Sequence, residues 1–158
     1  SCQKIFCYTK DIKNFPISLK KKIIVINPLV RKKIYNLNSI KRNKDDFTLL
    51  IVGGSQGADI FDKNLKNSIV NLSKKRSIKI IQQTNENNIH SLKDFYSQNN
   101  IESIIFSFDK NLSLNIQKAD LCITRAGAST LAELSVIRTP FIVVPLPNSN
   151  EMDEFSFS

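Results

Sequence analysis

The sequence is poor in the residues that build metal centres and catalytic dyads. Its only histidine is His90, and its three cysteines, Cys2, Cys7 and Cys122, do not have the spacing of a metal site. We expect His90 to lie exposed on a helix, away from the loops described below, and we exclude it as a catalytic base. We expect the cysteines to be buried apolar thiols, and their odd number favours a reducing compartment. We therefore expect no metal site, no bound cofactor and no catalytic pair of nucleophile and base.

Long hydrophobic runs are also missing. No apolar segment is long enough to span a bilayer, and residues 1–4 do not resemble the start of a signal peptide. The composition, 41% hydrophobic and 23% charged, is that of a globular protein and excludes a disordered chain. A length of 158 residues suits a single domain with a substantial core.

Negative charge is scarce in the first third of the chain. Residues 1–48 contain 12 lysines and arginines against 3 acidic residues, whereas residues 49–158 are balanced, so the whole net charge of +9 lies before Leu49. Such a block attracts an anionic membrane surface or nucleic acid, or is a solvated surface without a partner. No aromatic residues of an RNA-binding motif accompany it, and we therefore expect no nucleic-acid partner.

From Phe47 onward, short apolar runs alternate with amphipathic segments. The expected strands are residues 47–52, 78–81, 103–106, 121–123 and 141–144, and the expected helices lie around 61–72, 89–96, 112–119 and 130–136. Upstream, residues 4–8 and 22–26 are strand candidates and residues 29–37 a short basic helix. This alternation predicts an α/β, Rossmann-like fold, in which a parallel sheet is covered by helices on both faces. Ligands of such sheets bind beyond the carboxyl ends of the strands.

Two glycine-bearing loops lie at such strand ends. The first loop is Gly53–Ala58 and the second loop is Arg125–Thr130. Each indicates a strand, a tight turn and a helix, which together point backbone N–H groups and a positive helix end at an anion. A nucleoside diphosphate lying across both helix starts is the simplest ligand for this pair. The first loop is neither a Walker loop nor a Gly-x-Gly-x-x-Gly fingerprint, and by itself it also fits a plain turn.

Polar side chains in the two loops are candidates for holding the phosphates. In the first loop, Ser55 offers a hydroxyl and Gln56 an amide. In the second loop, Arg125 is a cation at a strand end, and Ser129 and Thr130 either cap the helix or donate to a phosphate.

Two further candidates lie outside the loop cores. Glu133 follows one helical turn into the second helix, where its carboxylate either accepts both hydroxyls of a ribose or only favours the positive helix end. Arg31, just after Asn27-Pro28, either reaches a phosphate across a cleft or is another surface cation.

In combination, these strings resemble the MurG family. The matching segments are Gly-Gly-Ser-Gln-Gly-Ala at 53–58 and, about 70 residues later, Arg-Ala-Gly-Ala at 125–128. Asn27–Arg31 is similar to the family's Gly-Asn-Pro-Val-Arg segment, with Ile26 in place of the glycine and Leu29 inserted. The family comprises the UDP-N-acetylglucosamine:undecaprenyl-pyrophosphoryl-MurNAc-pentapeptide transferases of peptidoglycan synthesis, which are two-domain GT-B glycosyltransferases.

The resemblance implies a domain organisation. Residues 1–38 correspond to the end of the family's N-terminal domain and the interdomain segment, and residues 39–158 to the UDP-sugar-binding C-terminal domain. We expect that domain to be incomplete at its C-terminus. The family's glutamine pair that reads the GlcNAc hydroxyls has no counterpart in Glu151–Ser158, and its N-terminal Gly-rich loop with the presumed catalytic histidine is absent.

The resemblance also assigns roles to single residues. It implies that Arg31 and Ser55 contact the UDP phosphates or the neighbouring sugar. Phe108 and Asp109 are equal candidates for the uracil contact. The diphosphate and ribose would lie along the start of the second helix, on Ala128, Ser129, Thr130, Leu131 and, at the ribose hydroxyls, Glu133.

The implied activity is an inverting, metal-independent transfer of GlcNAc from UDP-GlcNAc to undecaprenyl-linked MurNAc-pentapeptide. It would take place at the cytoplasmic face of the bacterial inner membrane, to which the protein would bind peripherally. We expect this chain alone to bind UDP weakly and to turn over nothing, because the acceptor site belongs mainly to the N-terminal domain. The alternatives are another GT-B transferase with a lipid acceptor, such as a diacylglycerol glycosyltransferase, and a non-catalytic UDP-sugar-binding module or subunit.

Overall fold

The computed structural model describes residues 2–27, 29–35, 46–54, 58–125 and 127–145. Two candidate phosphate contacts, Ser55 and Gln56, lie outside these residues, as does the expected domain boundary at residues 38 and 39. The division into two domains therefore stays a prediction.

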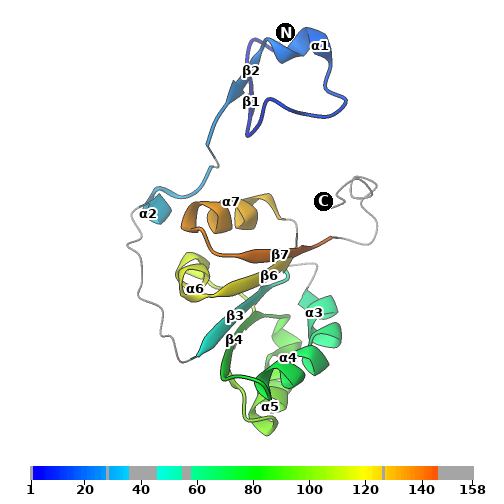
Figure 1. Cartoon of the computed structure of the whole chain (residues 1–158), viewed down its shortest axis with the longest axis vertical. Helices are drawn as coiled ribbons and strands as arrows, with labels where there is room; N and C mark the ends of the chain where they lie inside the picture. Colours follow the sequence, from blue (N-terminus) through cyan, green and yellow to red (C-terminus); the bar gives the residue numbers. More distant parts are fainter. Residues whose placement is uncertain (1, 28, 36–45, 55–57, 126, 146–158) are drawn as a thin grey trace.

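The strands form two parallel sheets (Figure 1). The small sheet pairs β1 (Ile5–Cys7) with β2 (Ile23–Val25). The large sheet has the order β5-β4-β3-β6-β7 and consists of β3 (Phe47–Val52), β4 (Ile78–Gln83), β5 (Glu102–Phe106), β6 (Leu121–Arg125) and β7 (Phe141–Val144). The five strands predicted from Phe47 onward are thereby confirmed, and so is the parallel pairing.

Helices cover both faces of the large sheet. The helices in the described part of the chain are α1 (Ile17–Lys20), α2 (Lys32–Tyr35), α3 (Ala58–Asn64), α4 (Lys66–Ser73), the 3₁₀ turn η1 (Glu86–Asn88), α5 (Ile89–Gln98), α6 (Leu112–Lys118) and α7 (Ala128–Ile137). Figure 1 shows α3, α4 and α5 on one side of the sheet and α6 and α7 on the other. The Rossmann-like α/β prediction is confirmed. No helix in the described part of the chain is long and apolar enough to cross a membrane.

The central strand β3 shows why the apolar runs are continuous. Leu49 and Ile51 face the core under α3, α4 and α5, whereas Leu50 and Val52 face the core under α6 and α7. All four side chains are buried. Because both faces of the strand are covered, apolar residues occupy every position instead of alternate ones.

A buried polar network ties α3 to β4 and α5. The carboxylate of Asp62 accepts hydrogen bonds from Gln82 Nε2 at 2.7 Å, from Asn88 Nδ2 at 2.9 Å and from the hydroxyl of Thr84. Tyr96 donates its hydroxyl to Gln82 Oε1 at 2.6 Å. Burial and, secondarily, the charge of Asp62 raise the pKa of Tyr96. Each buried polar group of the network thus has a partner, which fixes how the helices sit on the sheet.

Two local predictions were wrong. The segment 61–72 was expected to be one helix, but it is divided into α3 and α4 at Leu65, whose backbone angles of φ −92° and ψ −17° stay in the right-handed helical region. Asn64 donates its side-chain amide to the carbonyl of Ile60 at 2.8 Å, which competes with the backbone ladder at this point. The short helix α1 was not expected, and of the basic helix expected over residues 29–37, the described residues 29–35 are helical only over α2.

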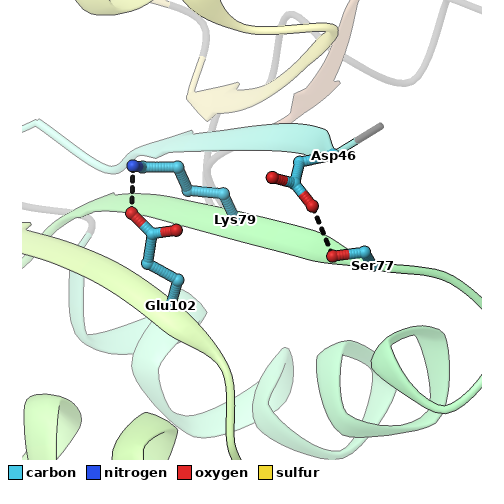
Figure 2. A network of polar contacts seen from close by, with 4 residues as sticks. All are labelled: Asp46, Ser77, Lys79 and Glu102. Atoms are coloured by element: carbon cyan, nitrogen blue, oxygen red, sulfur yellow. Dashed lines mark hydrogen bonds and ion pairs between the residues drawn. The ribbon is translucent and has the colours of Figure 1, made fainter. Parts of the chain in front are cut away.

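The amino ends of the strands carry exposed polar pairs (Figure 2). Lys79 of β4 forms an ion pair with Glu102, its direct neighbour on β5, and Ser77 donates to Asp46 just before β3. Exposed pairs of this kind contribute about 0–1 kcal/mol, so they adjust the sheet edge without deciding the fold. They also lie at the end of the sheet opposite to the two loops.

The strand order places the two loops together. From β3 the chain adds β4 and β5 on one side of the sheet and then crosses to add β6 and β7 on the other side. The switch point lies between β3 and β6, where Val52 is in register with Thr124. Ligands of open α/β sheets bind beyond the carboxyl ends of strands at such a point.

Candidate functional site

A cavity of about 290 Å³ opens beside the start of α7. Six of the eleven candidate residues line it: Arg31, Phe108, Asp109, Ser129, Thr130 and Glu133. The other lining residues are Leu29, Val30, Lys110, Leu112 and Ser113. Residues that are as far apart in the sequence as Arg31 and Glu133 therefore share one wall, as a ligand spanning both would require.

The start of α7 is open to an anion. Its N-cap is Gly127, which has no side chain to accept from the first N–H groups, and the first intrahelical bond is donated by Leu131 to Gly127 O at 3.0 Å. Ala128, Ser129 and Thr130 form the first turn. Of the two alternatives for Ser129 and Thr130, capping is wrong because neither occupies the N-cap. Donation to a phosphate remains a prediction.

The other two α7 candidates do not line this cavity. Ala128 is the first residue of α7, and Leu131 packs its side chain against the core cluster under α6 and α7. Any contact from Leu131 to a ligand would therefore come from its backbone. Glu133 lines the cavity one turn into α7, and it makes no ion pair with any described residue.

Arg31 is held at the cavity by α2. Ile34 of α2 is only 3% exposed, and α2 packs against α7. Ile34 also donates its N–H to Arg31 O at 2.9 Å, which fixes the turn that precedes the helix. The guanidinium of Arg31 lies 3.5 Å from the carbonyl oxygen of Lys110, at the long limit of a hydrogen bond, so it remains available to an anion.

Phe108 and Asp109 differ in what their side chains do. Phe108 is 74% exposed above the cavity. The carboxylate of Asp109 accepts from Asn111 N at 2.7 Å and from Asn115 Nδ2 at 2.8 Å, and it thereby organises the start of α6. The ring of Phe108 is therefore the freer of the two side chains for a flat ligand, while the backbone of either residue can face a base.

The first loop is anchored through Gln83, which the sequence analysis did not single out. Gly54 has φ +67°, a conformation that favours glycine, and its N–H donates to Gln83 Oε1 at 3.1 Å. Gln83 in turn donates Nε2 to the carbonyl oxygen of Ser107 at 3.1 Å. No motif signals such a glutamine, because its function depends on what lies beside the end of β4.

Arg125, at the end of β6, is 9% exposed, and its Nε and Nη1 atoms are buried without a partner. Buried donors are almost always satisfied in folded proteins. An orphaned guanidinium beside the two loops therefore points to an acceptor that is not part of the described residues. The sequence analysis noted this cation at the strand end.

The positions of the histidine and the cysteines exclude them as catalytic residues of this site. His90 is exposed on α5 and contacts Asp94 at 2.8 Å, as expected. Burial raises the pKa of Cys122 to about 12, which makes this thiol inert, whereas Cys2 is exposed and Cys7 partly so, contrary to the expectation of burial. Among the described residues, no three His, Cys, Asp or Glu side chains gather to hold a metal ion.

The arrangement suits a nucleoside diphosphate. A helix start and Arg31 offer positive charge to phosphates, Glu133 offers acceptors to sugar hydroxyls, and Phe108 offers an exposed ring to a base. Lys110 adds a second cation to the same wall.

Comparison with known proteins identifies what the chain is similar to. The family model described as "Glycosyltransferase family 28 C-terminal domain" matches residues 48–155. A Pelagibacter ubique (strain HTCC1062) protein is 50% identical over 154 residues, which are 98% of this chain and 43% of that protein. Its name is UDP-N-acetylglucosamine--N-acetylmuramyl-(pentapeptide) pyrophosphoryl-undecaprenol N-acetylglucosamine transferase.

Further comparisons agree. A Rickettsia felis (strain ATCC VR-1525 / URRWXCal2) protein of the same name is 40% identical, over 97% of this chain and 46% of that protein. The crystal structure of Acinetobacter baumannii MurG has a TM-score of 0.65 at 24% identity and covers 88% of this chain and 39% of that chain, which supports the fold. The chain spans less than half the length of these relatives.

Proposed function

Because the chain belongs to the family of glycosyltransferase family 28 C-terminal domains, we propose that it carries the donor-nucleotide site of a UDP-GlcNAc transferase. The predicted resemblance to the MurG family is confirmed. The whole enzyme would transfer GlcNAc to undecaprenyl-linked MurNAc-pentapeptide, the reaction named for its relatives. The observation that carries the proposal is the single cavity wall shared by Arg31, Phe108 and Glu133.

The proposed donor site works by electrostatics and positioning. The open start of α7 and the guanidinium of Arg31 stabilise the negative charge that develops on UDP as it leaves. The carboxylate of Glu133 accepts hydrogen bonds from the ribose hydroxyls, and Phe108 or the adjacent backbone contacts the uracil. A general base removes the proton from the acceptor hydroxyl, which then displaces UDP with inversion.

Titration calorimetry with UDP and with UDP-GlcNAc tests this proposal. We expect the chain to bind UDP and Glu133→Ala to lose at least tenfold in affinity, since a ribose acceptor is removed. Glu102→Ala is the matched control, because Glu102 is exposed at the opposite end of the sheet. Absence of UDP binding by the folded wild-type chain would contradict the proposal. A gain in affinity from the sugar would favour GlcNAc as the transferred group.

Two other classes of function give different outcomes. A GT-B transferase with another lipid acceptor would bind UDP but gain nothing from the N-acetyl group of UDP-GlcNAc relative to UDP-glucose. A non-catalytic nucleotide-binding module would bind UDP, yet addition of an acceptor-binding half from a relative would restore no transfer.

We also propose peripheral binding to the cytoplasmic face of an anionic membrane. Lys20 and Lys21 are exposed next to Ile17, which is 83% exposed on α1. Basic side chains beside an exposed apolar residue suit an anionic lipid surface. Co-sedimentation with phosphatidylglycerol vesicles, but not with phosphatidylcholine vesicles, is the expected result, and Lys20→Gln with Lys21→Gln should abolish it.

A further inference from the structure

We propose that Gln83 is a positioning residue that couples the phosphate side of the site to the base side. The inference rests on the proposed function, because it concerns how the same site holds a nucleotide. Gln83 belongs to neither of the two loops. It acts through the backbone of Gly54 on one side and of Ser107 on the other.

The two hydrogen bonds cross three neighbouring strands. Gln83 is the last residue of β4, which lies between β3 and β5 in the sheet. Its Oε1 accepts from Gly54 N, just beyond β3, and its Nε2 donates to Ser107 O, just beyond β5. The regular ladder between β4 and β5 ends at this level, where Thr84 N donates to Phe106 O at 2.9 Å. The side chain of Gln83 therefore links the backbones where the sheet no longer does.

Each partner leads directly to an element of the proposed site. Gly54 lies just beyond the carboxyl end of β3, beside the switch point at which ligands of open α/β sheets bind. Ser107 precedes Phe108 and Asp109, which line the cavity on the base side. UDP spans a limited range of distances between uracil and diphosphate, so the first loop and the segment that follows β5 must be held at a matching separation before it binds.

Glutamine suits this position because its amide both accepts and donates. A carboxylate at the same place accepts from Gly54 N but repels the carbonyl oxygen of Ser107, and an aliphatic side chain does neither. Gln83→Glu therefore removes one of the two links, and Gln83→Leu removes both at nearly constant volume.

The test compares UDP with its two parts, uridine and inorganic pyrophosphate, by NMR titration of the 158-residue chain. We expect Gln83→Leu to weaken UDP binding about tenfold, because it removes the two hydrogen bonds that hold the backbones of Gly54 and Ser107 at a set distance. Each part contacts only one of the two sides, so the binding of uridine and of pyrophosphate should weaken less than about twofold. Gln83→Glu should lie between wild type and Gln83→Leu. Gln98→Leu, on the exposed end of α5, is the matched control.

Hydrogen exchange of the Gly54 amide gives a readout without ligand. It should accelerate in Gln83→Leu and stay near the wild-type rate in Gln83→Glu, which retains the acceptor. Unchanged UDP affinity in Gln83→Leu, an equal loss for uridine and UDP, or an unchanged Gly54 exchange rate would each overturn the coupling. If the wild-type chain binds no UDP, the proposed function fails and this inference fails with it, which is a distinct result. Gln83→Glu decides the question if Gln83→Leu does not fold.

Discussion

The hydroxyl of Thr124 on β6 lies 3.1 Å from the carbonyl oxygen of Val52 on β3 and 3.1 Å from that of Arg125, so its one hydrogen is shared between the two acceptors. Thr124 and Val52 are buried, with exposures of 1% and 3%, and they are in register in the sheet. The bond to Val52 joins the two strands at their carboxyl ends, directly beneath the first and second loops. It therefore adds to the backbone ladder that holds these two strand ends together.

Removing this bond should lower stability. Thr124→Val keeps the branched shape but loses the donor, and we expect the free energy of unfolding in urea to fall by about 0.5–1.5 kcal/mol. UDP binding should weaken as well, because the strand ends separate more easily. Thr48→Val, at the amino end of β3, is the control. A Thr124→Val chain as stable as the control would show that the bond contributes nothing.

Substitution of Asp109 should mainly lower stability, whereas substitution of Phe108 should mainly weaken UDP binding. Because its carboxylate holds Asn111 and Asn115, Asp109→Ala should cost about 0.5–2 kcal/mol of stability, as for a lost helix cap. Phe108→Ala, at an exposed position, should change stability by less than about 0.5 kcal/mol. Its effect should appear as a roughly tenfold loss of UDP affinity in calorimetry. Equal UDP binding by wild type and Phe108→Ala would leave the base contact to the backbone.

The two glycines at the loops should respond differently to alanine. Gly54 has φ +67°, and nothing lies within 4 Å of the position of an added Cβ, so Gly54→Ala is strained by the backbone alone and should cost about 1–2 kcal/mol. Gly127 has φ −75°, and its added Cβ would make ordinary contact at 3.9 Å with the hydroxyl of Thr130.

Gly127→Ala should therefore leave the urea midpoint nearly unchanged. If it nevertheless weakens UDP binding, the reason for glycine at this position is close approach of the ligand rather than conformation. A large loss of stability in Gly127→Ala would contradict this interpretation.

The fold was predictable from the sequence because its signals are local. The apolar run of β3 and the loop that follows it sufficed to predict a buried parallel strand and its helix. The site was predictable only in part. Arg31 and Glu133 were candidates from the sequence alone, but their meeting depends on Ile34 burying α2 against α7, which no local pattern encodes. Gln83 was missed because its two partners, Gly54 and Ser107, follow different strands, β3 and β5.

Alkaline pH should destabilise the chain through two buried groups. Burial raises the pKa of the Cys122 thiol from 9.0 to about 12, and burial with the charge of Asp62 raises the pKa of Tyr96. The unfolded state releases these protons first, so the stability that they contribute is complete below about pH 9 and is lost as the pH rises toward 12.

We expect the urea midpoint to fall over this pH range and to fall less steeply in Cys122→Ala. The comparison with the variant isolates Cys122 from the general titration of lysines. At neutral pH, a thiol reagent should modify Cys2 in the folded chain and reach Cys122 only after denaturant is added. Modification of Cys122 in the folded chain would contradict its burial.

Replacement of Arg125 should weaken UDP binding without lowering the stability of the chain. The Nε and Nη1 atoms of Arg125 are buried without partners among the described residues, which is unfavourable in the ligand-free chain. Arg125→Met keeps much of the side-chain volume without the charge, and replacement of poorly compensated buried charge by an apolar side chain is often neutral or stabilising. We therefore expect the free energy of unfolding to stay level or to rise by about 1 kcal/mol, while UDP affinity falls at least tenfold. Arg76→Met serves as control, since this exposed arginine lies 4.4 Å from the ring of Phe47 and should lose about 0.5–1 kcal/mol without affecting UDP binding. A marked destabilisation by Arg125→Met would mean that the guanidinium has acceptors within the folded chain, and its role would then be structural.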